Sequence, residues 1–328
     1  MTTTNNNKQA VPGIRDGWFS ETEAMWPGQK FSLALEEFSE QKSVLFHQDS
    51  GHQKILVFRS AQYGNVLVLD GVIQLTERDE FAFHEMMVHL PLCSHPNPKS
   101  VCIVGGGDGG VLRQVRKHKC VKSITLVEID PMVTQVAKQY FRQDIRDAFE
   151  DPRLTIVQDD AANFIAAREA EFDVIITDNG DPIGPAQSLF EPAFYEKMYN
   201  ALAPEGIVCV QAESFWIHLD LISDLHACSN EIFSHAEYAS TMVPTYPCGQ
   251  IGFILAGKGT KSGTCRRPTR IPDFVQDLQW YNPQTHMAAF VLPTFVAKRL
   301  GQCNHDDDDD ADARERIDRC FLDNCTIS

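Results

Sequence analysis

The sequence of 328 residues lacks the signatures of several protein classes. Its ten cysteines include no C-x-x-C pair and no metal-type spacing, so neither a zinc ribbon nor a disulfide framework is predicted. No hydrophobic run approaches the roughly 18 residues of a membrane span, and the N-terminus lacks a signal-peptide core. A globular protein of the cytoplasm is therefore expected.

Basic residues are also few. The net charge of −16 argues against nucleic-acid binding and suits a cationic small substrate. Six of the negative charges lie in the tail, at Asp306–Asp310 and Asp312. Residues 1–16 and this acidic stretch, 301–328, are polar enough that we expect both to be disordered.

Between the two ends, the pattern divides the chain into two domains. Short apolar runs at 31–35, 55–58, 66–69 and 72–75 predict a small antiparallel β-domain over residues 17–76. Asp70-Gly71, between the last two runs, is typical of a type I′ hairpin turn. Residues 77–300 alternate between strands and helical segments, which predicts an α/β fold with a doubly wound, Rossmann-like sheet.

Four acidic residues stand at or just past the ends of successive predicted strands. Open α/β sheets bind ligands at the carboxyl ends of their strands, so we expect these acids to share a crevice. Gly105, Gly107 and Gly110 fit G-x-G-x-x-G, and such a loop lets the backbone approach a ligand closely. One such acid alone would usually be a helix cap or a solvated residue, whereas four favour a nucleotide-like ligand. The four are Asp108, Glu128, Asp159 and Asp178.

The stretch 174–190 carries two of the candidate functional acids. A buried strand over Val174–Thr177 ends on Asp178, Asp181 follows, and prolines and glycine then shape a loop. Two close carboxylates in a crevice can bind a cation or take a proton from one. The alternative is that Asp178 caps the next segment and Asp181 opens a turn.

From about Gly17 to Leu300 the chain resembles the polyamine aminopropyltransferases. The resemblance implies an N-terminal β-domain on a methyltransferase-like Rossmann domain, usually in a homodimer. It also implies transfer of an aminopropyl group from decarboxylated S-adenosylmethionine to putrescine, giving spermidine and 5′-methylthioadenosine, with no permanently bound cofactor and no metal. The stretches that carry it include Trp26-Pro-Gly-Gln29, Tyr63–Gln74, Thr76–Phe81, Gly105–Gly110, Glu128-Ile-Asp130, Asp181–Pro185, Pro244–Pro247 and Gly249–Phe253.

The resemblance also implies roles for individual residues. Asp178 is the expected base for the acceptor amine. Glu128 would hold the donor's ribose, Asp159 its adenine amino group and Asp108 the ammonium of its aminopropyl arm. Further donor contacts are expected at Gln53, His84, Asp160, Gly105 and Gly107. Acceptor contacts are expected at Asp181, Gln211, Tyr246, Trp26 and Phe83.

Three departures from the family pattern bear on specificity. Phe83 stands where the family usually has tyrosine, which removes a hydroxyl from the acceptor slot. Asn179-Gly180 replaces two small hydroxyl residues, and Asp160 stands where a small residue is usual. Phe83 could equally be plain core, and the loop changes could be neutral.

Other activities remain open at this point. A related transferase with another amine acceptor, or a putrescine N-methyltransferase, would use the same scaffold. Asp108 argues against the methyltransferase, because ordinary S-adenosylmethionine carries a carboxylate that an acid would repel. More remote alternatives are a catalytically inactive regulatory paralogue and an NAD-dependent oxidoreductase.

The last four residues, Cys325-Thr-Ile-Ser328, fit the C-a-a-X prenylation pattern. Cys320 is close enough to take a second lipid. The acidic run before them would be repelled by anionic membranes, and one prenyl chain anchors only marginally. The alternative is a chance match, so membrane association is expected only if Cys325 is prenylated.

Overall fold

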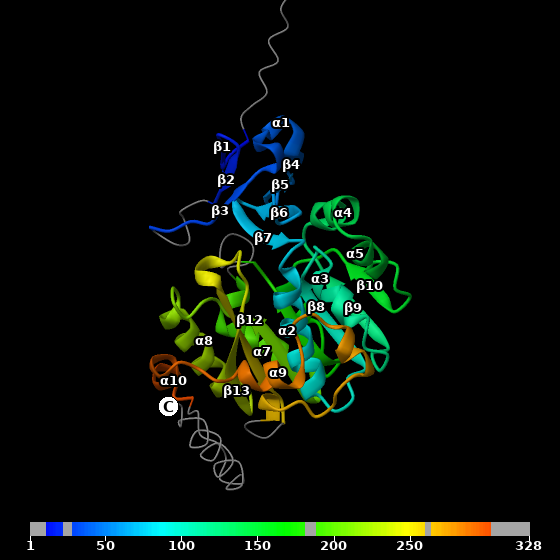
Figure 1. Cartoon of the computed structure of the whole chain (residues 1–328). Helices are drawn as coiled ribbons and strands as arrows, with labels where there is room; N and C mark the ends of the chain where they lie inside the picture. Colours follow the sequence, from blue (N-terminus) through cyan, green and yellow to red (C-terminus); the bar gives the residue numbers. More distant parts are fainter. Residues whose placement is uncertain (1–10, 22–27, 181–187, 260–263, 303–328) are drawn as a thin grey trace, which may run out of the picture.

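The computed structural model describes residues 11–21, 28–180, 188–259 and 264–302 (Figure 1). A small all-β region lies at one end of a larger α/β unit (Figure 1). Residues 14 and 15 lie in the stretch expected to be disordered, but Ile14 pairs with Phe19 and Arg15 with Trp18 across a turn at Gly17, whose φ of 78° is positive.

Two antiparallel sheets form the β-region. Asp70 and Gly71 both have positive φ, 48° and 86°, as a type I′ turn requires, so the predicted hairpin is confirmed. The three-stranded sheet contains β1 (Ile14–Arg15), β2 (Trp18–Ser20) and β3 (Ser32–Ala34). Two short helices, η1 (Glu36–Phe38) and α1 (Glu40–Ser43), lead to the four-stranded sheet of β4 (Val44–Asp49), β5 (Lys54–Arg59), β6 (Asn65–Leu69) and β7 (Val72–Thr76).

A seven-stranded mixed sheet is the centre of the larger unit. Its strands are β8 (Ser100–Gly105), β9 (Ser123–Val127), β10 (Leu154–Val157), β11 (Phe172–Asp178), β12 (Leu202–Gln211), β13 (His235–Met242) and β14 (Gln250–Gly257). Their order is β10-β9-β8-β11-β12-β14-β13; the first five are parallel, and β14 is antiparallel to both its neighbours. The predicted α/β fold is therefore confirmed.

Helices cover both faces of this sheet, because its buried strands are apolar on both sides. On β11, Val174 and Ile176 join the core beneath the helices α2 to α5, whereas Ile175 joins the core beneath α6, α7, α8 and α10. The helices are α2 (Glu80–Ser94), α3 (Gly110–Val115), α4 (Pro131–Tyr140), α5 (Gln143–Ala148), α6 (Ala161–Ala166), α7 (Pro192–Ala201), α8 (Leu219–Ile232), α9 (Pro283–Ala288) and α10 (Thr294–Leu300). Single turns η3 (Pro247–Gly249), η4 (Thr264–Arg266) and η5 (Asp273–Asp277) complete the described elements.

The four-stranded sheet joins the two parts of the molecule. Along β5, Leu56 and Phe58 pack into the core of the β-region, while Ile55 and Val57 pack into the core of the α/β unit. This alternation fixes the β-region against the carboxyl edge of the large sheet. Within the described ranges, no helix has the length and apolarity to cross a bilayer.

Candidate active site

The site begins where the sheet order reverses. Strands β8 and β11 are neighbours, and the connections after them leave in opposite directions, which is where open sheets bind ligands. Gly105 at the end of β8 pairs with Asp178 at the end of β11. Its φ is +71°, and a Cβ there would lie 2.3 Å from the Asp178 carbonyl oxygen, so only glycine fits.

A cavity of about 390 Å³ opens at this point. Its floor is the glycine loop, and its roof is formed by side chains of β6, β7 and the β4–β5 turn. The two parts of the chain therefore build the cavity together. Of the residues predicted to hold the donor, those in its lining are Gln53, Gly105, Gly107, Asp108, Glu128, Asp159 and Asp160.

Glu128 is held by the backbone on both carboxylate oxygens. Gly107 donates to Oε2 at 3.1 Å and Asp130 donates to Oε1 at 2.8 Å. Burial still dominates and, aided by the nearby charges of Asp130 and Asp108, raises the pKa of Glu128 to about 7. Each oxygen keeps a free lone pair, so this fixed carboxyl can accept from a pair of vicinal hydroxyls such as those of a ribose.

Gln53 links the β-region to the cavity. Its Nε2 donates to Asp130 Oδ2 at 3.0 Å, and Ser50 Oγ donates to the same oxygen at 2.6 Å. Asp130 also caps α4 by accepting from the Met132 amide. These hydrogen bonds hold the turn between β4 and β5 against the end of β9, where Glu128 lies.

Asp159 and Asp160 lie at the far rim of the cavity. The side chain of Asp159 accepts from the Asp160 amide, and Asp160 caps α6 by accepting from the Asn163 amide at 2.9 Å. Asp160 therefore has a structural role in the described chain besides its place in the lining.

Asp108 is anchored to the start of α3. The Gly110 amide donates to its Oδ1 at 2.7 Å, and its Oδ2 lies 3.7 Å from His84 Nε2. Burial opposes ionisation, but His84 outweighs it and lowers the pKa of Asp108. His84 is 1% exposed and lies behind Asp108, so within the described part it contacts this acid rather than the cavity.

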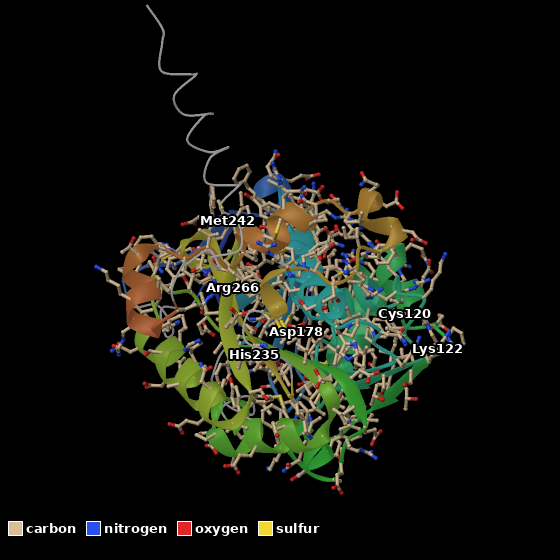
Figure 2. All side chains as sticks on the ribbon, turned by 90° about the horizontal axis from the view of Figure 1, so that it is seen from below. Cys120, Lys122, Asp178, His235, Met242 and Arg266 are labelled. Carbon is tan, nitrogen blue, oxygen red and sulfur yellow. The ribbon has the colours of Figure 1, made fainter. Side chains whose placement is uncertain are left out.

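Asp178 occupies the junction of two cavities. Seen from below, it projects near the middle of the molecule, whereas Lys122 lies at the rim (Figure 2). Burial, and then the charge of Asp108, raise the pKa of Asp178 to about 7. A carboxylate with a pKa near neutrality can both accept and release a proton at physiological pH.

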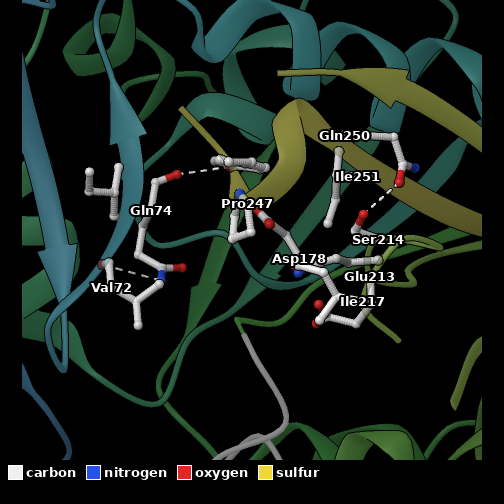
Figure 3. A pocket seen from close by; sticks show the side chains of 12 residues that line it. Val72, Gln74, Asp178, Glu213, Ser214, Ile217, Pro247, Gln250 and Ile251 are labelled. Atoms are coloured by element: carbon white, nitrogen blue, oxygen red, sulfur yellow. Dashed lines mark hydrogen bonds between the residues drawn. The ribbon is translucent and has the colours of Figure 1, made fainter. Parts of the chain in front are cut away.

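The second cavity, of about 40 Å³, lies on the other side of Asp178 (Figure 3). Gln211 and Tyr246 line it as expected, and Tyr246 donates to the Gln74 carbonyl oxygen at 2.9 Å. Glu213 also lines it; this buried residue has φ of +54°, and its Oε1 has no hydrogen-bond partner among the described residues. A strained residue with an unsatisfied carboxylate oxygen is suited to bind a cation.

Phe83 lies beside this cavity rather than in it. It is 2% exposed and packs against Tyr246 and Phe253, with ring centroids 5.6 Å apart in each case. Phe83 can therefore affect a ligand in this cavity only by fixing the position of Tyr246. Asp181 and Trp26 lie outside the described residues.

Sequence reasoning missed Gln74 and Glu213 as site residues, and it named Asn179 only as a departure from the family pattern. Gln74 lines both cavities, Glu213 lines the small one, and Asn179 lines the large one. Both polar side-chain atoms of Asn179 are buried without a partner in the part of the chain described. The polar Gln74 within the apolar run of β7 was the one available signal.

Among the described residues, two groups of side chains have ligand atoms close enough to hold a metal. They are His84, Asp108 and Asp178, and His89, Cys93 and His118. In the first, both nitrogens of His84 face carboxylates, so neither lone pair is free. In the second, Arg270 donates to His118 Nδ1, which leaves the proton on the Nε2 that a metal would need. Neither group fits a metal.

Two family models match the chain. A spermidine synthase tetramerisation domain covers residues 17–77, and a spermine/spermidine synthase domain covers residues 80–264. A spermidine synthase of Dictyostelium discoideum is 52% identical over 289 residues, which are 88% of this chain and 98% of the relative. The chain belongs to the spermine/spermidine synthase family.

Other members of the family agree in sequence and fold. Spermidine synthase 2 of Arabidopsis thaliana is 48% identical over 297 residues, 88% of this chain and 85% of the relative. A crystal structure of a spermidine synthase in complex with the transition state analogue AdoDATO has a TM-score of 0.80 at 32% identity, covering 90% of this chain and 99% of that one. The spermidine synthase of Thermotoga maritima has a TM-score of 0.79 at 32% identity, covering 92% and 100%.

Membership of the spermine/spermidine synthase family confirms the resemblance expected from the sequence. It leaves no basis for the alternative of an NAD-dependent oxidoreductase. The match of residues 17–77 to a tetramerisation domain indicates a multimer.

Proposed function

We propose that this protein transfers the aminopropyl group of decarboxylated S-adenosylmethionine to putrescine, forming spermidine and 5′-methylthioadenosine. The observation that carries the proposal is that Asp178 lines both cavities. The larger one, with acids spaced along its length, suits a nucleoside donor. The smaller, acid-lined cavity suits a slender diamine. A base at the junction of the two cavities lies where the amine nitrogen of the acceptor must approach the carbon that it attacks.

The reaction needs a base but no activation of the leaving group. The donor's sulfonium departs readily as a thioether, whereas an alkylammonium of pKa about 10 has no free lone pair at pH 7. Asp178 takes one proton from this ammonium. The amine then attacks in line: the N–C bond forms, the C–S bond breaks with its electron pair on sulfur, and Asp178 later releases the proton to water.

The donor contacts are proposed from the family resemblance, and the lining of the large cavity supports them. Glu128 would accept from the ribose hydroxyls and Asp159 from the adenine amino group, with Gln53 closing the roof. Asp108 would pair with the ammonium of the aminopropyl arm. Because S-adenosylmethionine carries a carboxylate on that arm, Asp108 selects the decarboxylated donor.

The acceptor would extend from Asp178 into the small cavity. Gln211 and Tyr246 would orient it, and the unpartnered Oε1 of Glu213 would bind its distal ammonium. Asp181 and Trp26 are proposed as further acceptor contacts on the strength of the family pattern.

We further propose a homodimer as the minimal assembly and the cytoplasm as its location. Sedimentation of the purified protein tests the first, and fractionation of its native cells tests the second. A dominant monomer, or an assembly with an odd number of subunits, would contradict the homodimer, and recovery in organelles would contradict the location.

The proposed activity is tested by incubating the purified chain with decarboxylated S-adenosylmethionine and a panel of diamines and triamines, and identifying products by mass spectrometry. Spermidine and 5′-methylthioadenosine are expected from putrescine. Methylated putrescine from S-adenosylmethionine would indicate an N-methyltransferase instead. No product with any pair would indicate an inactive paralogue.

A further inference from the structure

Five charged side chains of alternating sign run from the donor cavity to the surface behind Asp108. His84 Nε2 lies 3.7 Å from Asp108 Oδ2, and His84 Nδ1 lies 2.7 Å from Glu80 Oε2. Arg113 donates to the same Glu80 oxygen at 2.6 Å and pairs with Asp144 at 3.3 Å. The side chains of His84, Glu80 and Arg113 are at most 6% exposed, so these charges interact with little screening.

This arrangement fixes the charge of His84. Nδ1 lies within hydrogen-bond distance of Glu80 Oε2 and Nε2 lies 3.7 Å from Asp108 Oδ2, so an ionised carboxylate on each side of the ring favours a proton on both nitrogens. Burial alone would favour the neutral ring, but Asp108 and Glu80 outweigh it and raise the pKa of His84 to about 10. Burial opposes the ionisation of Glu80, but His84 and, after it, Arg113 outweigh burial and lower the pKa of Glu80 to about 2.

Once Asp178 has taken the acceptor's proton, Asp108 must still be ionised to pair with the ammonium of the donor. His84, Asp108 and Asp178 have atoms that all lie within 4.8 Å of one another, and Glu128 adds a further carboxyl nearby. Carboxylates this close tend to share one proton. If the proton rested on Asp108, the donor's ammonium would lose its partner.

We propose that Glu80 and Arg113 are positioning residues that hold His84 as an imidazolium against Asp108, so that Asp108 stays anionic and the acceptor's proton goes to Asp178. This inference rests on the proposed function. The charged groups facing His84 are Glu80 on its own helix, Asp108 from the glycine loop and Asp178 from β11. Lys117, just past α3, adds a weaker positive field at Glu80.

The first test measures protonation directly. Nitrogen chemical shifts of 15N-histidine-labelled protein report whether each imidazole is charged, and the His84→Gln variant assigns the signal. We expect His84 to be an imidazolium from pH 6 to pH 8.5 in the wild type. In the double variant Glu80→Gln/Arg113→Met, which removes both charges together, we expect it to titrate at least one pH unit lower.

The second test is the pH profile of kcat/KM for aminopropyl transfer. In His84→Gln, and in the double variant, we expect the apparent pKa on the acidic side of this profile to rise by at least one unit. At pH values above that apparent pKa, kcat/KM should return to within about threefold of the wild-type value. His89→Gln, the same substitution in the same helix, is the matched control and should leave that apparent pKa unchanged.

A neutral His84 at pH 7.5 in the wild type would overturn the inference. So would a loss of activity in His84→Gln that is uniform across pH, because that is what a merely structural role produces. If the wild type shows no aminopropyl transfer, the proposed function fails, while the chemical shifts still decide the charge of His84.

Discussion

Replacing Asp178 by Asn removes the proposed base while keeping the size of the side chain. At pH 7 only about one part in a thousand of an amine with pKa 10 is neutral, and general-base catalysis contributes roughly 10²–10⁴-fold. We therefore expect kcat to fall by about that factor. The residual rate should rise tenfold per pH unit toward the pKa of the amine, because solvent then supplies the neutral nucleophile.

The same substitution should stabilise the fold. The pKa of Asp178 is raised from 3.8 to about 7, so the folded state binds more protons than the unfolded state across that window and loses stability as pH rises through it. Above pH 7 the ionised, buried carboxylate costs the folded protein up to roughly 4 kcal/mol. Asp178→Asn should recover roughly 2–4 kcal/mol of this at pH 8.

Three measurements check this reasoning. Stopped assays across pH 6–10 give kcat, calorimetry gives donor affinity, which should change less than threefold, and denaturant titration gives stability. Asp173→Asn, at the other end of β11, controls for damage to the strand. A variant that keeps more than a tenth of kcat at pH 7.5, or whose rate is flat with pH, would show that Asp178 is not the base.

Four further predictions follow from other parts of the molecule. Asp108→Ile should raise KM for the decarboxylated donor and lessen discrimination against S-adenosylmethionine; an unchanged ratio of kcat/KM values would refute the charge argument. Phe83→Tyr should change the relative kcat/KM values for different acceptor amines more than it changes the affinity for the donor. If these relative values are unchanged, Phe83 has only a packing role. Burial lowers the pKa of His89 to about 3, so the folded state is stabilised above pH 6.5 and loses that stability as pH falls. Between pH 7.5 and pH 5.5, the free energy of unfolding should fall by about 1.4 kcal/mol more in the wild type than in His89→Gln. Equal decreases in the two proteins would contradict this. Intact-mass analysis of native protein should show a farnesylated fraction at Cys325, and a wholly unmodified C-terminus would end that idea.

Features that depend on local spacing could be predicted from the order of the residues alone. The apolar run ending at Asp178 predicts a buried strand because β-branched residues favour that backbone. Asp70-Gly71 predicts its turn because few residues tolerate positive φ. The glycine loop and Glu128 follow strand ends, and parallel strands end at the same edge, so their meeting in one crevice could be predicted without coordinates.

Features that depend on contacts between distant segments became visible only in the folded chain. Gln74 and Glu213 line the small cavity because β7 of the small sheet lies over the ends of β11 and β12. Phe83 and His84 are neighbours in sequence on α2, yet one packs behind Tyr246 and the other behind Asp108. The charge on His84 likewise requires Glu80 and Asp108 on opposite sides of one ring. The i,i+4 spacing on α2 places Glu80 beside His84, but Asp108 reaches the other side of the ring only because α2 packs against the glycine loop.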